Sequence, residues 1–240
     1  MKVFLLAGQS NMVGYGLNRE LPNGFAAPTR SKIATHMTQR EWRPLAPGFG
    51  RDKNYFGPEI TFEREISRFY PSDRLFFVKV SHGGTSLAYD WFTAREPNGE
   101  CGAWYALFRD TYRAMLATLD SPEIAGMLWM QGESDCYFET DRPKAVVYEE
   151  NLLRFFGGVR RDAGLPHMPI VVGQISASLS WAYGSIVREA QKCACEQADR
   201  VMLVPTYDLS ISSDGTHYDT RGQLELGSRF AQALTTLIDQ

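Results

Sequence analysis

Five short apolar runs recur along the chain, and each is typical of a strand that is covered on both faces. The runs are four to seven residues long and show little alternation of apolar and polar positions. They occupy residues 3–7, 75–80, 124–130, 170–175 and 201–204. Because alternation is weak, we expect both sides of each strand to pack against other elements instead of facing water.

Segments with the period of an amphipathic helix lie between and after these runs. The first begins at Pro58, a residue suited to the first helical position, and extends to Tyr70. Its candidate core residues are Ile60, Phe62, Ile66 and Phe69. Further helices are predicted at residues 104–119, 143–161, 186–198 and 220–238. The last carries one apolar stripe that core packing explains, made of Leu224, Gly227, Phe230, Leu234 and Leu237.

Strands that alternate with helices imply βαβ units with right-handed crossovers. The sequence therefore predicts an α/β fold, a three-layer α/β/α sandwich around a five-stranded parallel sheet. The chain has 240 residues, of which 44% are hydrophobic, and no Pro/Gly-rich stretch separates two self-sufficient halves. We expect a single domain over residues 1–240. Residues 15–57, rich in Gly, Pro and Asn, are expected to form a long irregular insertion beside the functional site.

The charge balance excludes two classes of partner. The formal net charge is −3 and the isoelectric point is about 5.9, with no compensating block of Lys or Arg. We therefore expect no nucleic-acid and no membrane partner, and predict a partner that is either neutral or small. The apolar run after Lys2 is too short for a signal peptide or a membrane span. As written, the chain is predicted to be cytoplasmic, which leaves open a signal removed before this numbering begins.

Cysteine and histidine spacing indicates neither disulfides nor a metal site. There are no CxxC pairs, and we expect four free thiols, at Cys101, Cys136, Cys193 and Cys195. His36 and His167 have no acid at ligand spacing, so surface or capping roles are favoured. Three converging ligands cannot be assembled from the sequence, and no metal or cofactor is predicted.

Small and polar residues gather where four of the five predicted strands end. In an open parallel sheet, ligands bind beyond the carboxyl ends of the strands, so these ends are expected to share one site. The stretches are Gly8-Gln9-Ser10-Asn11, Ser81-His82-Gly83-Gly84, Gln131-Gly132-Glu133-Ser134-Asp135 and the later Asp214-Gly215-Thr216-His217.

These stretches contain the parts needed for serine attack on an ester. Ser10 lies where the first strand breaks into a turn, and Gly8 allows the sharp bend that exposes its hydroxyl. We predict Ser10 as the nucleophile. His217 is the one histidine placed beyond a strand end and close after an aspartate, and we predict it as the base.

Two carboxylates are candidates for orienting His217. Asp214 precedes it by three residues, and a tight turn can return its carboxylate to Nδ1. Glu133 follows the end of a different strand, and its side chain is longer than that of Asp214. We favour Asp214 as the main partner, with Glu133 as a second carboxylate on the same ring. A turn-forming role for Asp214 is the simpler alternative.

The oxyanion that forms in ester hydrolysis needs preorganised donors. The predicted donors are the backbone N–H of Ser10, the backbone N–H of Gly84 and the side-chain amide of Gln131. Four further residues are predicted to line the substrate site: Gln9, Asn11, His82 and Trp91.

Taken together and in chain order, these stretches resemble the SGNH-hydrolase superfamily, and more narrowly its branch of sialate O-acetylesterases and acetylxylan esterases. Phe56-Gly57-Pro58-Glu59 resembles the same branch, and the resemblance covers nearly the whole chain. It implies a flavodoxin-like SGNH hydrolase fold and removal of O-acetyl groups from carbohydrate without a metal. Typical superfamily members carry an aspartate at the position of Gln9 and an asparagine in the third block. The resemblance implies that Gln131 takes over the asparagine's oxyanion role and that Glu133 shares the acid's role.

The predicted chemistry is a two-step acyl transfer through an acetyl-Ser10 intermediate, relayed by His217. Activity is then expected to fall below about pH 6 to 7, where a free imidazole protonates. Aromatic residues of the insertion and of later loops are equally suited to stacking on a sugar ring and to packing on the core. A lipase or thioesterase on the same scaffold is an alternative, as is a carbohydrate-binding module without catalysis. The presence of both Ser10 and His217 argues against the binding module.

Overall fold

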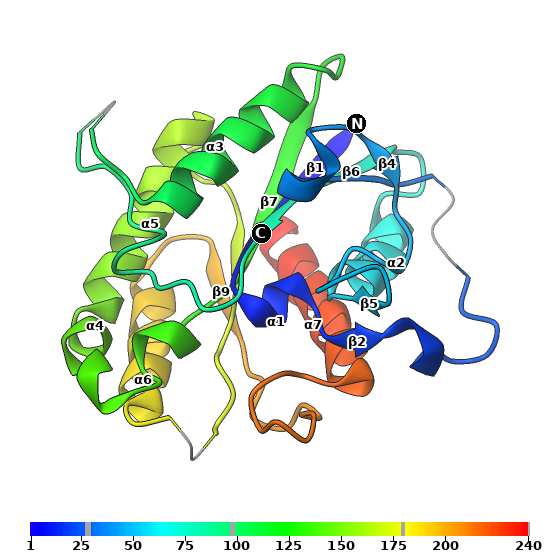
Figure 1. The fold of residues 1–240 in the computed structure, drawn as a ribbon. Helices are drawn as coiled ribbons and strands as arrows, with labels where there is room; N and C mark the ends of the chain where they lie inside the picture. The colour runs from blue at the N-terminus through cyan, green and yellow to red at the C-terminus, as the bar shows by residue number, and fades with distance from the viewer. Residues whose placement is uncertain (27–29, 97–98, 179–180, 240) are drawn as a thin grey trace.

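A seven-stranded sheet runs through the middle of the molecule, with β1 (Lys2–Gly8) at its centre (Figure 1). The computed structural model of the chain describes residues 1–26, 30–96, 99–178 and 181–239. The strand order is β4-β3-β6-β1-β7-β8-β9. The other strands of the sheet are β3 (Lys32–Thr35), β4 (Arg43–Pro44), β6 (Leu75–Ser81), β7 (Glu123–Met130), β8 (Ile170–Gly173) and β9 (Val201–Val204). Only the edge strand β4 is antiparallel to its neighbour, and the described pairings are otherwise parallel.

The prediction of five strands is wrong in number, because residues 15–57 contribute two more to the sheet. β3 pairs in parallel with β6, and β4 pairs with β3. Two further strands, β2 (Gly16–Leu17) and β5 (Tyr55–Phe56), form a separate ribbon that joins the two ends of this segment. β3 has only four residues and is flanked by turn residues, so its sequence shows no period. Its strand conformation comes from pairing with β6.

Two layers of helices cover the sheet, as the three-layer prediction requires (Figure 1). On one face, α2 (Glu59–Phe69) packs against α7 (Thr220–Ile238). The other face carries α3 (Ala103–Leu116), α5 (Tyr148–Ala163) and α6 (Gly184–Gln197). Shorter elements are α1 (Ser10–Val13), α4 (Arg142–Val146) and the 3-10 turns η1 (Asn18–Glu20), η2 (His36–Thr38), η3 (Glu133–Asp135) and η4 (Glu139–Asp141). The single helix predicted at 143–161 is therefore two, which separate at Val147.

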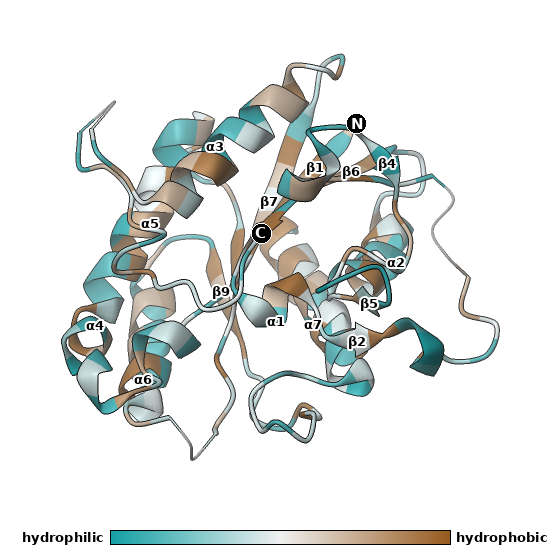
Figure 2. Ribbon diagram, viewed as in Figure 1, coloured by the Kyte–Doolittle hydropathy of each residue, from teal (hydrophilic) through white to brown (hydrophobic). Residues whose placement is uncertain are grey.

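Apolar side chains of the strands and helices form one core between the layers. Figure 2 shows apolar residues along β1 and β7, while the flanking helices mix apolar and polar positions. Phe4 of β1 contacts Phe62 of α2 edge-on, with ring centroids 5.3 Å apart. In α7, Gly227 allows close helix packing, because a Cβ there would lie 2.2 Å from the carbonyl oxygen of Pro58. Phe69 and Leu224 lie at the margin of this core and are only partly buried.

A buried ion pair that the sequence analysis did not identify joins four parts of the fold. Lys79 of β6 donates from Nζ to Oε2 of Glu59 at 2.7 Å, and both side chains are at least 98% buried. The same ammonium group donates to the carbonyl oxygens of Val13 and Phe49. It therefore ties the end of α1 and the segment 15–57 to the sheet and to α2.

The strand register brings the predicted strand ends to one edge of the sheet. Gly8 is paired with Ser81 on one side and with Met130 on the other. Met130 is paired with Gly173, which is paired with Val204. The loops that leave these strands therefore start side by side, as we expected from the parallel arrangement.

Two further features complete the fold. All four cysteines are free thiols, as predicted. No helix in the described part of the chain combines the length and the apolarity needed to cross a membrane.

Candidate active site

The turn that presents Ser10 depends on the close approach of β1 and β7. Gly8 has a φ of 147°, and a Cβ at this position would lie 2.0 Å from the carbonyl oxygen of Met130. That carbonyl accepts a hydrogen bond from the N–H of Gln9, and His82 N–H donates to the carbonyl of Gly8. Any side chain at Gly8 would push the strands apart. The chain then turns into α1, whose first residue is Ser10.

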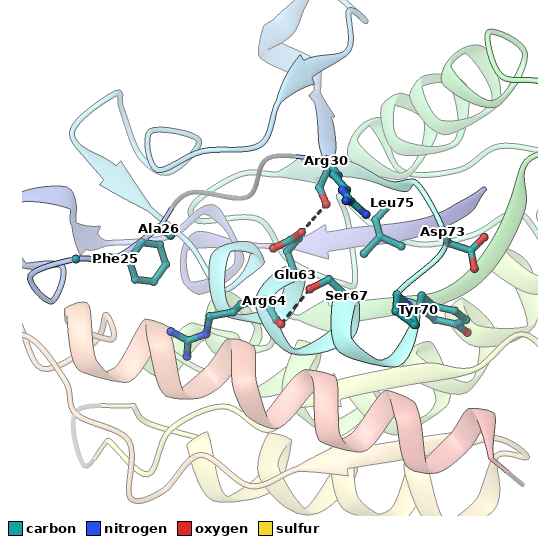
Figure 3. A pocket seen from close by; sticks show the side chains of 12 residues that line it. Phe25, Ala26, Arg30, Glu63, Arg64, Ser67, Tyr70, Asp73 and Leu75 are labelled. Carbon is teal, nitrogen blue, oxygen red and sulfur yellow. Dashed lines mark hydrogen bonds between the residues drawn. The ribbon is translucent and has the colours of Figure 1, made fainter.

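A cavity of about 440 Å³ lies beyond the carboxyl ends of the strands. It is lined by Ser10 and His217, which stand near opposite ends of the chain, and by Gln9, Gly84, Glu133, Ser134, Tyr137, Phe138, Asp141, Lys144 and Thr216. A larger cavity of about 660 Å³ lies elsewhere, beside α2, and Figure 3 shows Glu63 and Tyr70 among its lining residues. None of the predicted site residues lines it. The smaller cavity is therefore the candidate active site.

The imidazole of His217 is held at Nδ1 by Asp214. The distance from Nδ1 to Oδ2 of Asp214 is 2.7 Å, and Oδ1 accepts hydrogen bonds from the backbone N–H groups of Thr216 and His217. Partial burial raises the pKa of Asp214, but these hydrogen bonds outweigh it and hold the pKa well below its usual range. Asp214 is thus a permanent anion that fixes the ring orientation. The remaining nitrogen, Nε2, is left for chemistry.

One face of His217 is covered by Tyr15, a residue of the segment 15–57. The two rings are stacked, with centroids 3.8 Å apart and planes within 3° of parallel. The guanidinium of Arg51 lies over the Tyr15 ring, 5.5 Å from its centroid. The sequence analysis missed Tyr15, because nothing local indicates which aromatic residue of the segment meets the histidine.

Asn11, the residue after Ser10, holds both neighbours of His217. Its Oδ1 accepts from the N–H of Tyr218 at 3.0 Å, and its Nδ2 donates to the carbonyl of Thr216 at 3.3 Å. Nδ2 also donates to Oε1 of Glu133 at 2.7 Å. Asn11 is fully buried, so it joins loops instead of lining the cavity as predicted. These bonds bring the loop of the candidate base to the turn of the candidate nucleophile.

Glu133 lines the cavity but takes a different partner from the one predicted. Its Oε1 accepts from Asn11, and the described residues show no hydrogen bond between Glu133 and His217. Its Oε2 is buried and has no partner. Burial raises the pKa of Glu133 to about 7, opposed by hydrogen bonds that include the one from Asn11. The orienting role on the ring accordingly lies with Asp214.

The amide of Gln9 is oriented by three donors. Its Oε1 accepts from Gln131 Nε2 at 3.2 Å and from the backbone N–H groups of Gly132 and Ser134 at 3.3 and 3.2 Å. Because backbone N–H groups can only donate, the amide oxygen must face them. The amide nitrogen, Nε2, has no acceptor among the described residues. The side chain of Gln9 lines the cavity.

Gln131 does not line the cavity, contrary to its predicted place among the oxyanion donors. Its Nε2 donates to Oδ2 of Asp135 at 2.6 Å and to the carbonyl of Thr85 at 3.0 Å, while its Oε1 accepts from Tyr148. Asp135 in turn accepts from the N–H of Leu87. This buried network connects the loop after β6 with the loop after β7. The sequence indicated the residue type but not the direction of its amide.

Two backbone donors remain. The N–H groups of Ser10 and Gly84 have no acceptor among the described residues, and both residues line the cavity. Gly84 has a φ of 77° in the turn after β6, a conformation that glycine adopts without strain. With Nε2 of Gln9, these groups make three donors on residues that line the same cavity as Ser10.

The other predicted lining residues lie outside the cavity. Trp91 is fully buried in the core and donates from Nε1 to Thr85, so it cannot reach a ligand. His82 is exposed and stacks on Trp104, with ring centroids 4.3 Å apart. Instead, Tyr137 and Phe138 form an aromatic wall that the sequence analysis did not identify. The described residues contain no group of three His, Cys, Asp or Glu arranged to hold a metal ion.

A cavity lined by a serine at a strand end, an imidazole held by a carboxylate and backbone N–H groups without an acceptor is an arrangement suited to ester hydrolysis. Residues 1–236 match the model of the family described as carbohydrate esterase, sialic acid-specific acetylesterase, and the chain belongs to that family. It is therefore a carboxylic ester hydrolase of the carbohydrate esterases, as the resemblance indicated.

Known relatives agree with this assignment. The chain is 28% identical to a probable carbohydrate esterase of Arabidopsis thaliana, over 97% of this chain and 89% of that protein. An X-ray structure of an Arabidopsis thaliana protein superposes with a TM-score of 0.80 at 26% identity, covering 98% of both chains. A carbohydrate acetylesterase from Xanthomonas citri shares the fold, with a TM-score of 0.71 at 19% identity, over 99% of this chain and 56% of that one.

Proposed function

We propose that the protein is a serine esterase that removes O-acetyl groups from carbohydrate through an acetyl-Ser10 intermediate. One observation carries the proposal: Asn11, directly after Ser10, hydrogen-bonds to the backbone on both sides of His217. Ser10 and His217 consequently line the same cavity. A protein that only bound ligands would not need this arrangement.

In the first step, Nε2 of His217 takes the proton of the Ser10 hydroxyl as Oγ attacks the acetyl carbonyl carbon. The carbonyl oxygen becomes negative and accepts hydrogen bonds from the N–H groups of Ser10 and Gly84 and from Nε2 of Gln9. The imidazolium is stabilised by Asp214 at Nδ1. When the tetrahedral intermediate collapses, His217 donates its proton to the departing sugar oxygen.

In the second step, water replaces the sugar. His217 takes a proton from the water, whose oxygen attacks the acetyl carbon of acetyl-Ser10. Collapse releases acetate and returns a proton to Oγ of Ser10. Asn11 and Glu133 act as positioning residues: Asn11 hydrogen-bonds to the His217 loop, and Glu133 accepts a hydrogen bond from Asn11.

The test compares Ser10→Ala, His217→Ala and Asp214→Asn with the native protein, using initial rates on p-nitrophenyl acetate. Ser10→Ala and His217→Ala are each expected to lower kcat at least about a thousandfold, and the double variant little further, because the residues act as a unit. His167→Ala is a matched control, since His167 pairs with Asp199 at 3.0 Å on the surface.

The intermediate can be detected directly. With rapid acid quench, the peptide containing Ser10 should gain the mass of one acetyl group in the native protein and not in Ser10→Ala. Full activity in Ser10→Ala, or loss of activity in His167→Ala equal to that in His217→Ala, would contradict the proposal.

A further inference from the structure

We infer that Tyr137 and Phe138 form a subsite for a neutral pyranose ring, the sugar that carries the acetyl ester. The inference rests on the proposed function and names its substrate class. It starts from two adjacent aromatic side chains that solvent reaches, with exposed fractions of 40% for Tyr137 and 63% for Phe138. Both line the cavity that contains Ser10 and His217.

The two rings are held in place before any ligand binds. They meet edge to face, with centroids 4.7 Å apart and planes at 68°. The N–H of Phe138 donates to Oδ2 of Asp141 at 2.8 Å, and the carbonyl of Tyr137 accepts from Ala182 N–H. These backbone hydrogen bonds and the contact between the rings reduce the conformational entropy that the two side chains lose on binding.

The position of the two rings determines which part of an ester substrate can contact them. An ester bound for attack by Ser10 has two parts, the acetyl group and the alcohol. The acetyl group is small, so the alcohol part must extend along the cavity wall. A pyranose presents an apolar face of C–H groups that suits an aromatic ring, while its hydroxyls suit polar neighbours.

The charges around the cavity favour a neutral sugar. Lys144 is the one lysine or arginine among the described residues that line it, and it is already paired. Its Nζ lies 2.9 Å from Oδ1 of Asp141 and donates to the carbonyl of Ser134 at 2.5 Å. Glu133 lies on the same wall. A sugar carboxylate, such as that of a sialic acid, would meet the carboxyl group of Glu133 and no unpaired Lys or Arg among the described lining residues.

The experiment measures kcat/KM on three acetate esters: an acetylated xylo-oligosaccharide, an O-acetylated sialic acid and methyl acetate. The native protein should prefer the neutral sugar ester to the sialic acid ester by at least about tenfold. Phe138→Ala and Tyr137→Ala should each lower kcat/KM on the neutral sugar ester about tenfold, and on methyl acetate less than twofold. Tyr207→Ala is the control, since Tyr207 is 67% exposed and outside the cavity.

Two outcomes would overturn the inference while leaving the esterase intact. One is equal loss of methyl acetate and sugar ester hydrolysis in Phe138→Ala. The other is a preference of the native protein for the sialic acid ester. If that preference disappears in Arg51→Gln, the sugar carboxylate is bound by the guanidinium above Tyr15. If the native protein hydrolyses none of the three esters, the proposed function itself fails.

Discussion

The ring of His217 is constrained by contacts of three kinds. Asp214 accepts at Nδ1, Tyr15 covers one face, and Asn11 holds the backbone on both sides. In the proposed mechanism the ring becomes positive in each step. The two flat rings pack face to face, so Tyr15 helps to keep the imidazole in one orientation.

The Tyr15 stack gives a prediction at the residue scale. Tyr15→Ala is expected to lower kcat on p-nitrophenyl acetate about tenfold, because the imidazole loses the ring that holds its orientation. Tyr15→Phe keeps the aromatic face and should retain most of the activity. Circular dichroism distinguishes this from a general loss of fold: the spectrum of Tyr15→Ala should match that of the native protein. An unchanged kcat in Tyr15→Ala would contradict the role.

At the scale of elements, the site depends on how α1 and the loop of residues 15–57 are attached to the sheet. The attachment is the pair formed by Lys79 and Glu59, which is buried and also reaches the carbonyls of Val13 and Phe49. Burial lowers the pKa of Lys79, an effect that the charge and hydrogen bond of Glu59 oppose. The ammonium is tolerated there because it has three acceptors.

Breaking this pair should destabilise the protein more than removing both charges. Lys79→Met leaves a buried carboxylate without its partner, and we expect a loss of about 3 to 5 kcal/mol in the free energy of unfolding. Adding Glu59→Gln removes the unpaired charge and should restore a large part of that loss. Urea unfolding monitored by tryptophan fluorescence measures both variants. A double variant no more stable than Lys79→Met would disprove this account.

At the scale of the whole molecule, two buried carboxyl groups connect the site to the stability of the fold. Burial raises the pKa of Glu133 to about 7 and that of Asp135 to about 6, each partly offset by hydrogen bonds. The folded chain therefore binds protons at a pH where the unfolded chain has lost them. The resulting stabilisation is fully present below the unfolded pKa values and disappears as pH rises through about 6 to 7.

This linkage predicts the pH dependence of the free energy of unfolding. A shift in the pKa of Glu133 from 4.5 to about 7 corresponds to a decrease of at most about 3 kcal/mol in the free energy of unfolding between pH 5 and pH 8. Glu133→Gln removes this contribution, so its unfolding free energy should fall less over that range than that of the native protein. The exposed Glu189→Gln is the control. Parallel pH profiles for Glu133→Gln and the native protein would exclude the linkage.

Much of the architecture could be predicted from sequence because its signals are local. The runs that became β1, β6, β7, β8 and β9 are apolar at nearly every neighbouring position, and the helices that separate them show a helical period. β3 could not be predicted, since four residues carry too little pattern and its conformation depends on β6. The break at Val147 could not be predicted for a different reason, because the helical pattern of apolar residues continues through it.

By itself the sequence determined which chemical groups leave the strand ends, and in what order: a serine after β1, a glycine turn after β6, an amide and a carboxylate after β7, and a histidine near the end. Parallel strands place their carboxyl ends at one edge, so these groups had to gather there. Only the tertiary structure decided between similar groups. Gln9, not Gln131, turns its amide to the cavity, Asp214 takes the ring of His217, and Tyr15 covers it. These choices depend on the directions of side chains that meet across distant segments, and no local pattern encodes such directions.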